Sequence, residues 1–304
     1  MARYTMRQLM AMAERRLAKA IGRTEREITQ IYAAVREDIR AELAKVYEKH
    51  AVDGKLTRAQ MAKYGRLEKL EKELTKKLND ADRKVINKNH TLARDQYKEG
   101  YYNRAWVLDN ELESRLGWGL LNDKAVRAAV ENPFHKIADS RLLKDGRTRI
   151  RSAIASGLTR GDSFAQMSKE IGEAINGNRY AAMRIARTEA GRAQTIGTQR
   201  THERAEQLGV VGNEYWSATL DERTRIKHGQ LDGVPKNREQ NGWKIPGRNQ
   251  YTPGPKQSGI AAFDINCRCG VEYRVDDEAP SVRRIRGKGV VPYQNYSEWR
   301  QAIT

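Results

Sequence analysis

Apolar residues recur every three or four positions over the first 115 residues, which is the period of an α-helix. One stripe precedes an Asp53-Gly54 turn, and a second follows Thr57, which begins the capping-box pattern Thr-x-x-Gln. The two stripes consist of Ile28, Ile31, Val35, Ile39, Leu43 and Val46, and of Leu67, Leu70, Leu74, Leu78, Ala81 and Val85. The pattern predicts a long antiparallel helical hairpin over residues 1–115, whose second helix runs from 57 to about 112.

Between residues 116 and 212 the helical pattern is interrupted by Gly, Pro and Asn. The breaks fall at Asn132-Pro133, Gly157, Asn176-Gly177-Asn178 and Gly209. They divide this middle region into four expected helices, over residues 123–131, 148–156, 162–175 and 179–208.

After Gly212, residues 214–219 and 267–275 alternate between apolar and polar side chains as short strands do. Four Pro and five Gly in residues 232–259 predict turns and loops between them. The expected fold class is therefore α+β and predominantly α. We expect a helical hairpin for docking a partner (1–115), a folded body with helices in 123–208 and short strands and loops in 213–276 (together 116–276), and a basic C-terminal tail (277–304).

The charge of the chain adds a candidate partner to this picture. Lys and Arg number 57 against 39 Asp and Glu, a net charge of +18 that divides into +8, +6 and +4 over residues 1–115, 116–212 and 213–304. Such a surplus favours a polyanion such as DNA, although a solvated basic surface explains each local cluster equally well. The two clusters that are candidate nucleic-acid contacts are Arg141, Lys144, Arg147, Arg149 and Arg151, and Arg283, Arg284, Arg286 and Lys288.

The absence of known nucleic-acid-binding motifs limits the kind of DNA contact that we expect. The chain contains no zinc-finger, basic-zipper or RNA-recognition signature, so any DNA contact is expected to involve the phosphate backbone without base specificity. No stretch approaches the roughly 20 apolar residues that a membrane span needs. The N-terminal residues also lack a signal-peptide pattern, so we expect a protein that is made in the cytoplasm.

Cys267 and Cys269 are the residues of this sequence that most specifically indicate a chemical site. They lie two positions apart on a predicted strand, so their side chains share a face, and with His228 they would supply three of the four ligands that zinc usually takes. However, C-x-C is not the usual C-x₂-C knuckle, and buried free cysteines that pack as small hydrophobic residues are commoner. We therefore expect no cofactor, with zinc as the alternative. Two cysteines this close also exclude a stabilising disulfide framework.

Two further polar groups leave their interpretation open. Arg187-Thr188-Glu189 lies inside a predicted helix, where a packing cluster of ion pairs is favoured over a catalytic glutamate. Asp221, Arg223, Thr224, Arg225 and His228 follow the first strand. A polar loop held by hydrogen bonds is favoured there over an anion site or an acid–base pair, and a dyad of Cys267 and His228 lacks an orienting partner. No P-loop, GxGxxG or HExxH motif occurs, so no enzyme class emerges.

Several of these motifs occur in an order that resembles the phage Mu F-like head morphogenesis proteins. The resemblance covers roughly residues 140–275, and the hairpin turn Asp53-Gly54-Lys55-Leu56-Thr57 is also similar to a D-G-x-L-T turn in the family. Pro253-Gly254-Pro255 fits imperfectly, because the family more often has P-G-D-P. The stretches that carry the resemblance are Ile185-Ala186-Arg187-Thr188-Glu189, Tyr215-Trp216-Ser217-Ala218, Asp221-x-Arg223-Thr224-Arg225, His228, Leu231-Asp232-Gly233 and Asn266-Cys267-Arg268-Cys269.

The resemblance implies a minor capsid protein of a tailed double-stranded DNA phage, associated with the portal vertex during procapsid assembly. It implies the portal protein, a major capsid or scaffolding protein and double-stranded DNA as partners. It also implies a place inside the head near the portal vertex, after assembly in the host cytoplasm. The family brings no agreed catalytic activity, so we expect no enzyme. The alternative is a toxin-like or metal-dependent enzyme built on Asp221, His228, Cys267 and Cys269.

Overall fold

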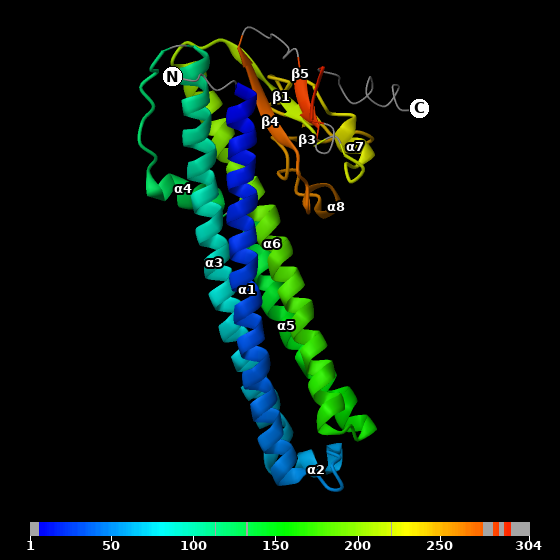
Figure 1. Cartoon of the computed structure of the whole chain (residues 1–304). Coiled ribbons are helices and arrows are strands. Elements are labelled where there is room, and N and C mark those ends of the chain that lie inside the picture. The colour runs from blue at the N-terminus through cyan, green and yellow to red at the C-terminus, as the bar shows by residue number, and fades with distance from the viewer. Residues whose placement is uncertain are drawn as a thin grey trace. The chain divides into compact units, whose positions relative to one another are not determined.

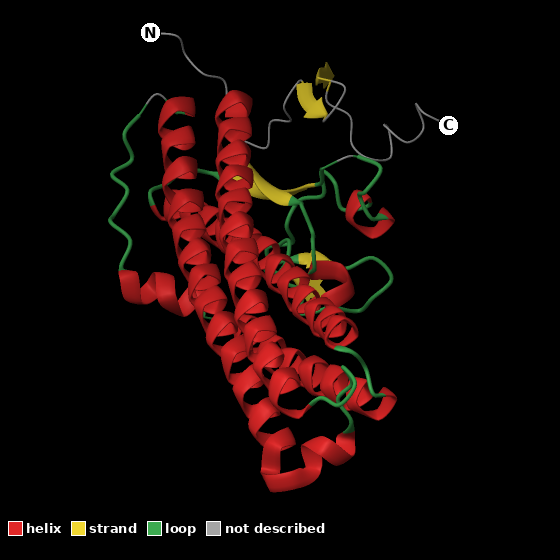
Figure 2. Cartoon of the chain, turned by 60° about the horizontal axis from the view of Figure 1, so that its bottom comes forward, coloured by secondary structure: helices red, strands yellow, loops and turns green. Residues whose placement is uncertain are grey.

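The structure, a computed structural model, describes residues 6–112, 114–131, 133–219, 221–275, 282–285 and 289–292. Helices dominate, and the described strands all follow residue 211 (Figures 1 and 2). The helices are α1 (Met6–His50), α2 (Arg58–Ala62), the 3₁₀ turn η1 (Lys63–Gly65), α3 (Arg66–Glu111), α4 (Asp123–Val130), α5 (Pro133–Arg160), α6 (Phe164–Gln207), α7 (Ile226–Gly229) and α8 (Ala261–Asp264). The strands are β1 (Gly212–Ser217), β2 (Trp243–Lys244), β3 (Tyr251–Thr252), β4 (Gly270–Val275), β5 (Val282–Ile285) and β6 (Gly289–Pro292). The predicted class, α+β and predominantly α, is confirmed.

The chain divides into two compact units that are not sequential segments. Unit 1 comprises Met1–Ala20, Leu92–Val130 and Arg187–Thr304, and unit 2 comprises Ile21–Thr91 and Glu131–Ala186. Helices α1, α3 and α6 contribute residues to both units, so the units do not coincide with the expected segments 1–115 and 116–276.

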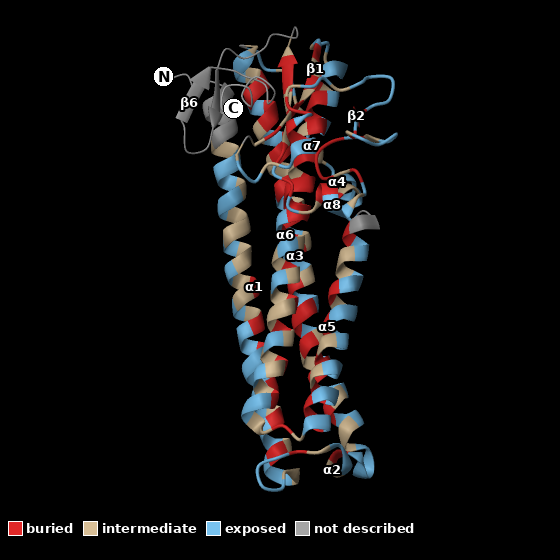
Figure 3. Cartoon of the chain, turned by 90° about the vertical axis from the view of Figure 1, so that its right-hand side faces the viewer, coloured by how far each residue is buried: buried red, intermediate tan, exposed pale blue. Residues whose placement is uncertain are grey.

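Unit 2 is a bundle in which segments of α1, α3, α5 and α6 run side by side, with buried residues on the facing sides and exposed residues outside (Figures 1 and 3). On α1 the buried stripe differs slightly from the predicted one, because Tyr32 and Tyr47 are buried in place of Ile31 and Val46. Each tyrosine hydroxyl has a polar partner: Tyr32 donates to Asp82 Oδ1 at 2.5 Å, and Tyr47 donates to the Asp162 carbonyl at 2.8 Å. Burial of an aromatic ring whose hydroxyl is hydrogen-bonded is favourable.

The turn between α1 and α2 has the predicted form. Asp53 and Gly54 both adopt positive φ, 49° and 71°, and Val52 and Lys55 exchange backbone hydrogen bonds of 3.0 Å. Thr57 forms the predicted capping box, since Thr57 and Gln60 bond each other's backbone N–H groups. The prediction of an uninterrupted helix from residue 57 is wrong. The left-handed residues Tyr64 (φ 55°) and Gly65 (φ 64°) interrupt the helix after α2, and α3 begins at Arg66.

In the described residues of the middle region there are three helices instead of the four expected. The break after α4 is confirmed, but Pro133 is the first residue of α5, where its missing N–H has no helical partner to lose. Gly157 and Asn176-Gly177-Asn178 lie inside α5 and α6 and do not end them. A Cβ atom on Gly146 of α5 would overlap the Asn178 side chain of α6, so this glycine permits close contact between the two helices. The end of α6 beside Gly209 (φ 87°) is as predicted.

Unit 1 contains a close crossing of α3 and α6. A Cβ atom on Gly100 would overlap the backbone oxygen of Gln194, and one on Gly197 would overlap that of Tyr97. The two helices therefore touch backbone to backbone, with a glycine on each. Val126 of α4 packs into the hydrophobic cluster that Ala93 and Tyr97 of α3 form with Ala193 of α6.

The strands of unit 1 are short antiparallel pairs. Strands β1 and β4 pair from Gly212 opposite Val275 to Ser217 opposite Gly270, close to the two predicted strands. Strands β2 and β3 form a second pair and β5 and β6 a third. The last pair lies in the segment expected to be a tail. Of the C-terminal basic cluster, Arg286 and Lys288 lie outside the described residues, as do the side chains of Arg283 and Arg284.

Candidate functional site

The structure brings His228, Cys267 and Cys269 together in unit 1. His228 lies in α7, and the two cysteines lie in the segment that leads into β4. The Nδ1 atom of His228 is 3.4 Å from Cys267 Sγ and 3.3 Å from Cys269 Sγ. The exposed fractions of the three residues are 2%, 6% and 5%, so the cluster is buried.

Aromatic rings hold the imidazole of His228 in place. Its ring centroid lies 4.2 Å from that of Phe263 and 6.0 Å from that of Trp216, which meets it edge-on. The Nε2 atom is buried and has no hydrogen-bond partner among the described residues. Within that part of the chain, the polar contacts of this imidazole are therefore the two sulfur atoms.

The two cysteine thiols are electrostatically unequal. A hydrogen bond from Cys269 lowers the pKa of Cys267 to about 4, with further help from His228 and Lys256. The same interaction, together with burial, raises the pKa of Cys269. Lys256 is also buried, and its Nζ donates to the Cys269 carbonyl at 2.6 Å. The arrangement thus favours one thiolate beside one thiol.

Asp221 belongs to a separate group in the signature loop. It accepts hydrogen bonds from the Arg223 backbone at 3.0 Å and the Thr224 hydroxyl at 3.3 Å, and Arg268 clamps both carboxylate oxygens. The Arg268 hydrogen bond is the chief reason that the pKa of Asp221 falls to about 2. The polar contacts of Asp221 organise a turn and tie it to Arg268, whereas those of His228 are with the cysteines.

The other signature residues of this region connect its loops to one another. Arg225 donates to the carbonyls of Phe263 and Ile265, and Asp232 accepts from the Ala218 backbone at 2.8 Å. Gly233 and Asn266 supply positive φ, 73° and 56°, at turns.

Of the helical motif, Arg187 is exposed, while Thr188 and Glu189 are buried. Thr188 accepts from the Asn266 backbone at 3.3 Å, and Glu189 pairs with Arg192 at 2.9 Å. Arg192 in turn donates to the Lys256 carbonyl at 2.6 Å. The signature residues therefore tie the loops to α6.

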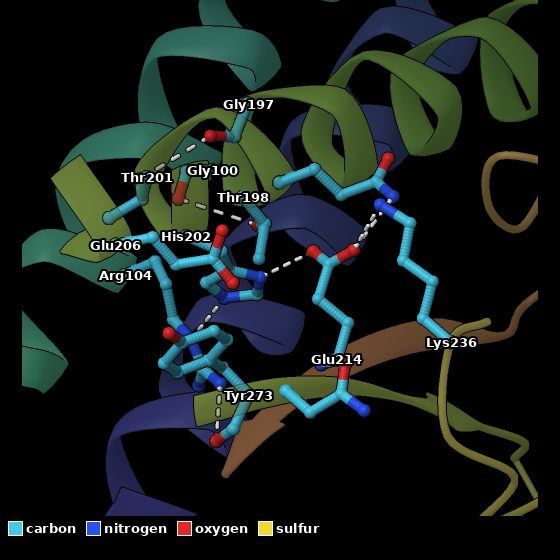
Figure 4. Close-up of polar contacts among 12 residues, drawn as sticks. Gly100, Arg104, Gly197, Thr198, Thr201, His202, Glu206, Glu214, Lys236 and Tyr273 are labelled. Carbon is cyan, nitrogen blue, oxygen red and sulfur yellow. Dashed lines mark hydrogen bonds and ion pairs between the residues drawn. The ribbon is translucent and has the colours of Figure 1, made fainter. Parts of the chain in front are cut away.

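Sequence reasoning missed a buried ionic chain in unit 1 (Figure 4). Arg104 donates to His202 Nε2 at 2.8 Å, so His202 carries its proton on Nδ1 and donates it to Glu214 at 2.6 Å. Glu214 also pairs with Lys236 at 2.9 Å. One feature of the sequence could have indicated that Glu214 is buried. It lies two positions before Trp216 on the predicted strand, so the two side chains share a face of β1, and that face is buried.

Burial sets the charge states along this chain. Burial is the main reason that the pKa of His202 falls to about 4, and the Arg104 charge adds to it. Burial would raise the pKa of Glu214, but the contacts with His202 and Lys236 outweigh it and lower the pKa to about 2. A neutral imidazole therefore links the Arg104 cation to the Glu214 anion near pH 7.

The basic cluster at residues 141–151 lies on α5, and its members differ in exposure. Arg141, Lys144 and Arg147 are exposed and recur every three residues. Arg151 is also exposed and lies 3.6 Å from Glu71. Arg149 instead donates to Asn178 Oδ1 at 2.6 Å and is part of the packing between α5 and α6.

Among the described residues, no helix combines the length and apolarity of a membrane span.

Comparison with known proteins places the chain in a family. The model for "Phage Mu protein F like protein" matches residues 148–272, close to the stretch expected from the motifs. Over 294 residues, 94% of each chain, the protein is 33% identical to the "Minor head protein GP7" of Bacillus phage SPP1.

A second relative is the "NAD(+)--arginine ADP-ribosyltransferase EFV" of Enterococcus faecalis. It is 32% identical over 209 residues, which are 67% of this chain but 42% of that protein. No solved structure matches. Since the likeness to a minor head protein spans nearly the whole of both chains, the chain belongs to the phage Mu F-like family of minor head proteins and is a virion component of head morphogenesis.

Proposed function

We propose that this minor head protein joins the procapsid at the portal vertex and lies beside packaged DNA, which it contacts without sequence specificity. The observation that carries the proposal is the nearly full-length likeness to the minor head protein of SPP1. The net charge of +18 supports the DNA contact, because a protein next to a packaged genome meets a dense array of phosphates.

The exposed face of α5 is the described surface that best suits phosphate contact. Arg141, Lys144 and Arg147 lie within two turns of one helix, and all three are exposed. Backbone phosphates are bound by Lys and Arg without reading bases, which suits a protein that must accept any genome sequence. Arg149 is left out of this surface because it is engaged by Asn178.

DNA binding is expected to weaken steeply with salt and to depend on this face. Replacing Arg141, Lys144 and Arg147 with Gln should reduce the slope of log K against log salt by about 0.9 for each phosphate that the variant no longer neutralises. Fluorescence anisotropy with duplexes of two unrelated sequences measures both effects.

The matched control replaces Lys69, Lys72 and Lys76 with Gln. These residues are also exposed, but they alternate with glutamates on α3, so binding should hardly change. Binding that is flat between about 50 and 200 mM salt would contradict any DNA contact. Equal weakening in both triple variants would contradict the α5 face.

Portal association is tested by assembly. The chain is co-expressed with the portal, scaffolding and major capsid proteins of its phage, and procapsids are separated by sedimentation. We expect it in procapsids that contain portal protein, and at background level in shells assembled without it. Equal incorporation into portal-free shells would show that it binds the capsid wall instead.

An enzyme is the second candidate, and the partial likeness to an ADP-ribosyltransferase favours it. More than half of that transferase lies outside the match. We therefore propose that the shared part is the head-protein module and that this chain acts structurally. Incubation with labelled NAD⁺ and arginine-rich acceptors tests this proposal, and transfer of the label would overturn it.

A further inference from the structure

We propose that His228, Cys267 and Cys269 bind one zinc ion, which joins the loop containing α7 to the segment leading into β4. This proposal goes beyond the assembly role and does not depend on it. A metal here would stabilise the small α+β part of unit 1.

The spacing of the three ligand atoms fits a tetrahedral zinc ion. Zn–N bonds of about 2.0 Å and Zn–S bonds of about 2.3 Å at tetrahedral angles place nitrogen about 3.5 Å from each sulfur. The observed distances from His228 Nδ1 are 3.4 Å to Cys267 and 3.3 Å to Cys269. The three ligand atoms lie within 4.8 Å of one another, so a single ion can reach all of them.

The surroundings of the imidazole also favour a metal over a hydrogen bond. His228 is buried in an apolar cluster that includes Trp216 and Phe263, and sulfur atoms are weak hydrogen-bonding partners. A buried imidazole with such partners is poorly satisfied as a hydrogen-bonding group. As a zinc ligand its Nδ1 atom would have a strong partner, and both cysteines would be deprotonated and together balance the ion's two positive charges.

The local fold explains why a cross-link matters here. Where the structure describes residues 212–275, they contain two strands of six residues, and the other regular elements between these strands have two or four residues each. Small, loop-rich regions are often stabilised by a metal or disulfides. The ligands are 39 and 41 residues apart along the chain, so the ion would close a long loop. The described residues supply three ligands at this site, so the fourth would come from outside them.

A second group of metal-binding residue types serves as a control. His90, His135 and Asp139 lie close together in unit 2, but His90 Nε2 is already hydrogen-bonded to Asp139 at 2.7 Å. The variant His90→Asn alters this group without touching the cysteines.

Metal content of the purified full-length chain tests the proposal. We expect about one zinc ion per chain by elemental analysis, bound by two sulfurs and one nitrogen in X-ray absorption spectra. Zinc should be lost in Cys267→Ser and His228→Asn and retained in His90→Asn. Cobalt loading should give thiolate-to-metal charge-transfer absorption that Cys267→Ser abolishes.

A variant that fails to fold does not weaken this test, because the wild-type chain is informative alone. Titration of its two thiols with a mercurial should release one zinc ion per two thiols modified, as detected by a chromogenic chelator. A zinc-free wild-type chain that also takes up no cobalt would overturn the proposal. Zinc retained in Cys267→Ser but lost in His90→Asn would overturn it as well.

Discussion

Replacing Gly197 with alanine is expected to lower the free energy of unfolding by about 3 kcal/mol, because overpacking at a rigid contact has a cost of this size. The new Cβ atom would overlap the Tyr97 carbonyl oxygen, and its nearest neighbours are all backbone atoms of α3. A side chain could rotate away, but a helix backbone cannot. Helices α3 and α6 would have to separate, which would also disturb the reciprocal contact at Gly100. Thermal and urea unfolding of the wild type and of Gly197→Ala measures the loss of stability.

Gly172→Ala is the matched control on the same helix. Its nearest contact would be Arg36 Cδ at 3.8 Å, which is ordinary van der Waals distance. Alanine favours the helix over glycine, so this variant should be more stable by up to about 1 kcal/mol. Similar effects of the two substitutions would show that the crossing of α3 and α6 is looser than the structure indicates.

Replacing Glu214 with leucine is expected to destabilise the protein by about 3–5 kcal/mol, because it removes the anion from a buried ionic chain. Glu214 is 5% exposed and accepts from both His202 and Lys236. Its replacement would take away the carboxylate that pairs with Lys236 and that Arg104 reaches through the neutral imidazole (Figure 4). Glu203→Leu, which removes an exposed carboxylate of α6 that pairs with Arg200, is the control and should cost less. Equal destabilisation would contradict a special role for the buried chain.

The same chain predicts a pH dependence. The pKa of His202 is about 4 in the folded protein against an ordinary value of 6.5, so the unfolded chain binds the proton more readily. The stability that His202 contributes is thus complete above pH 6.5 and is lost as pH falls toward 4, by about 3 kcal/mol in the limit. Glu214 adds a further loss below pH 4.5, whereas Asp82, whose pKa is raised to about 6, changes stability in the opposite direction.

Comparison with a variant separates His202 from Asp82. The stability advantage of the wild type over His202→Gln should shrink between pH 7 and pH 5, because glutamine keeps a polar side chain but does not titrate. His50→Gln, at the end of α1, provides the control. An advantage that stays constant over this range would contradict a neutral buried His202.

Local signals in the sequence determined where several elements begin and end. The Asp53-Gly54 turn, the Thr57 capping box and the stop at Gly209 depend on neighbouring residues, and all three have the predicted form. The alternation around Trp216 likewise located β1. Residue types alone also picked out His228, Cys267 and Cys269 as one candidate set.

Tertiary structure decided the features that depend on distant partners. Asn176-Gly177-Asn178 stays helical because Asn178 bonds Asp82 and the Leu142 carbonyl, contacts invisible to a local pattern. Arg104 and His202 are 98 residues apart, so no spacing rule could pair them. The sequence by itself determined the first long helix, the two longer strands, the family motifs and the candidate ligands. Only packing decided which glycines are contacts between helices, which charges are buried, and that both sulfurs lie within 3.4 Å of one imidazole nitrogen.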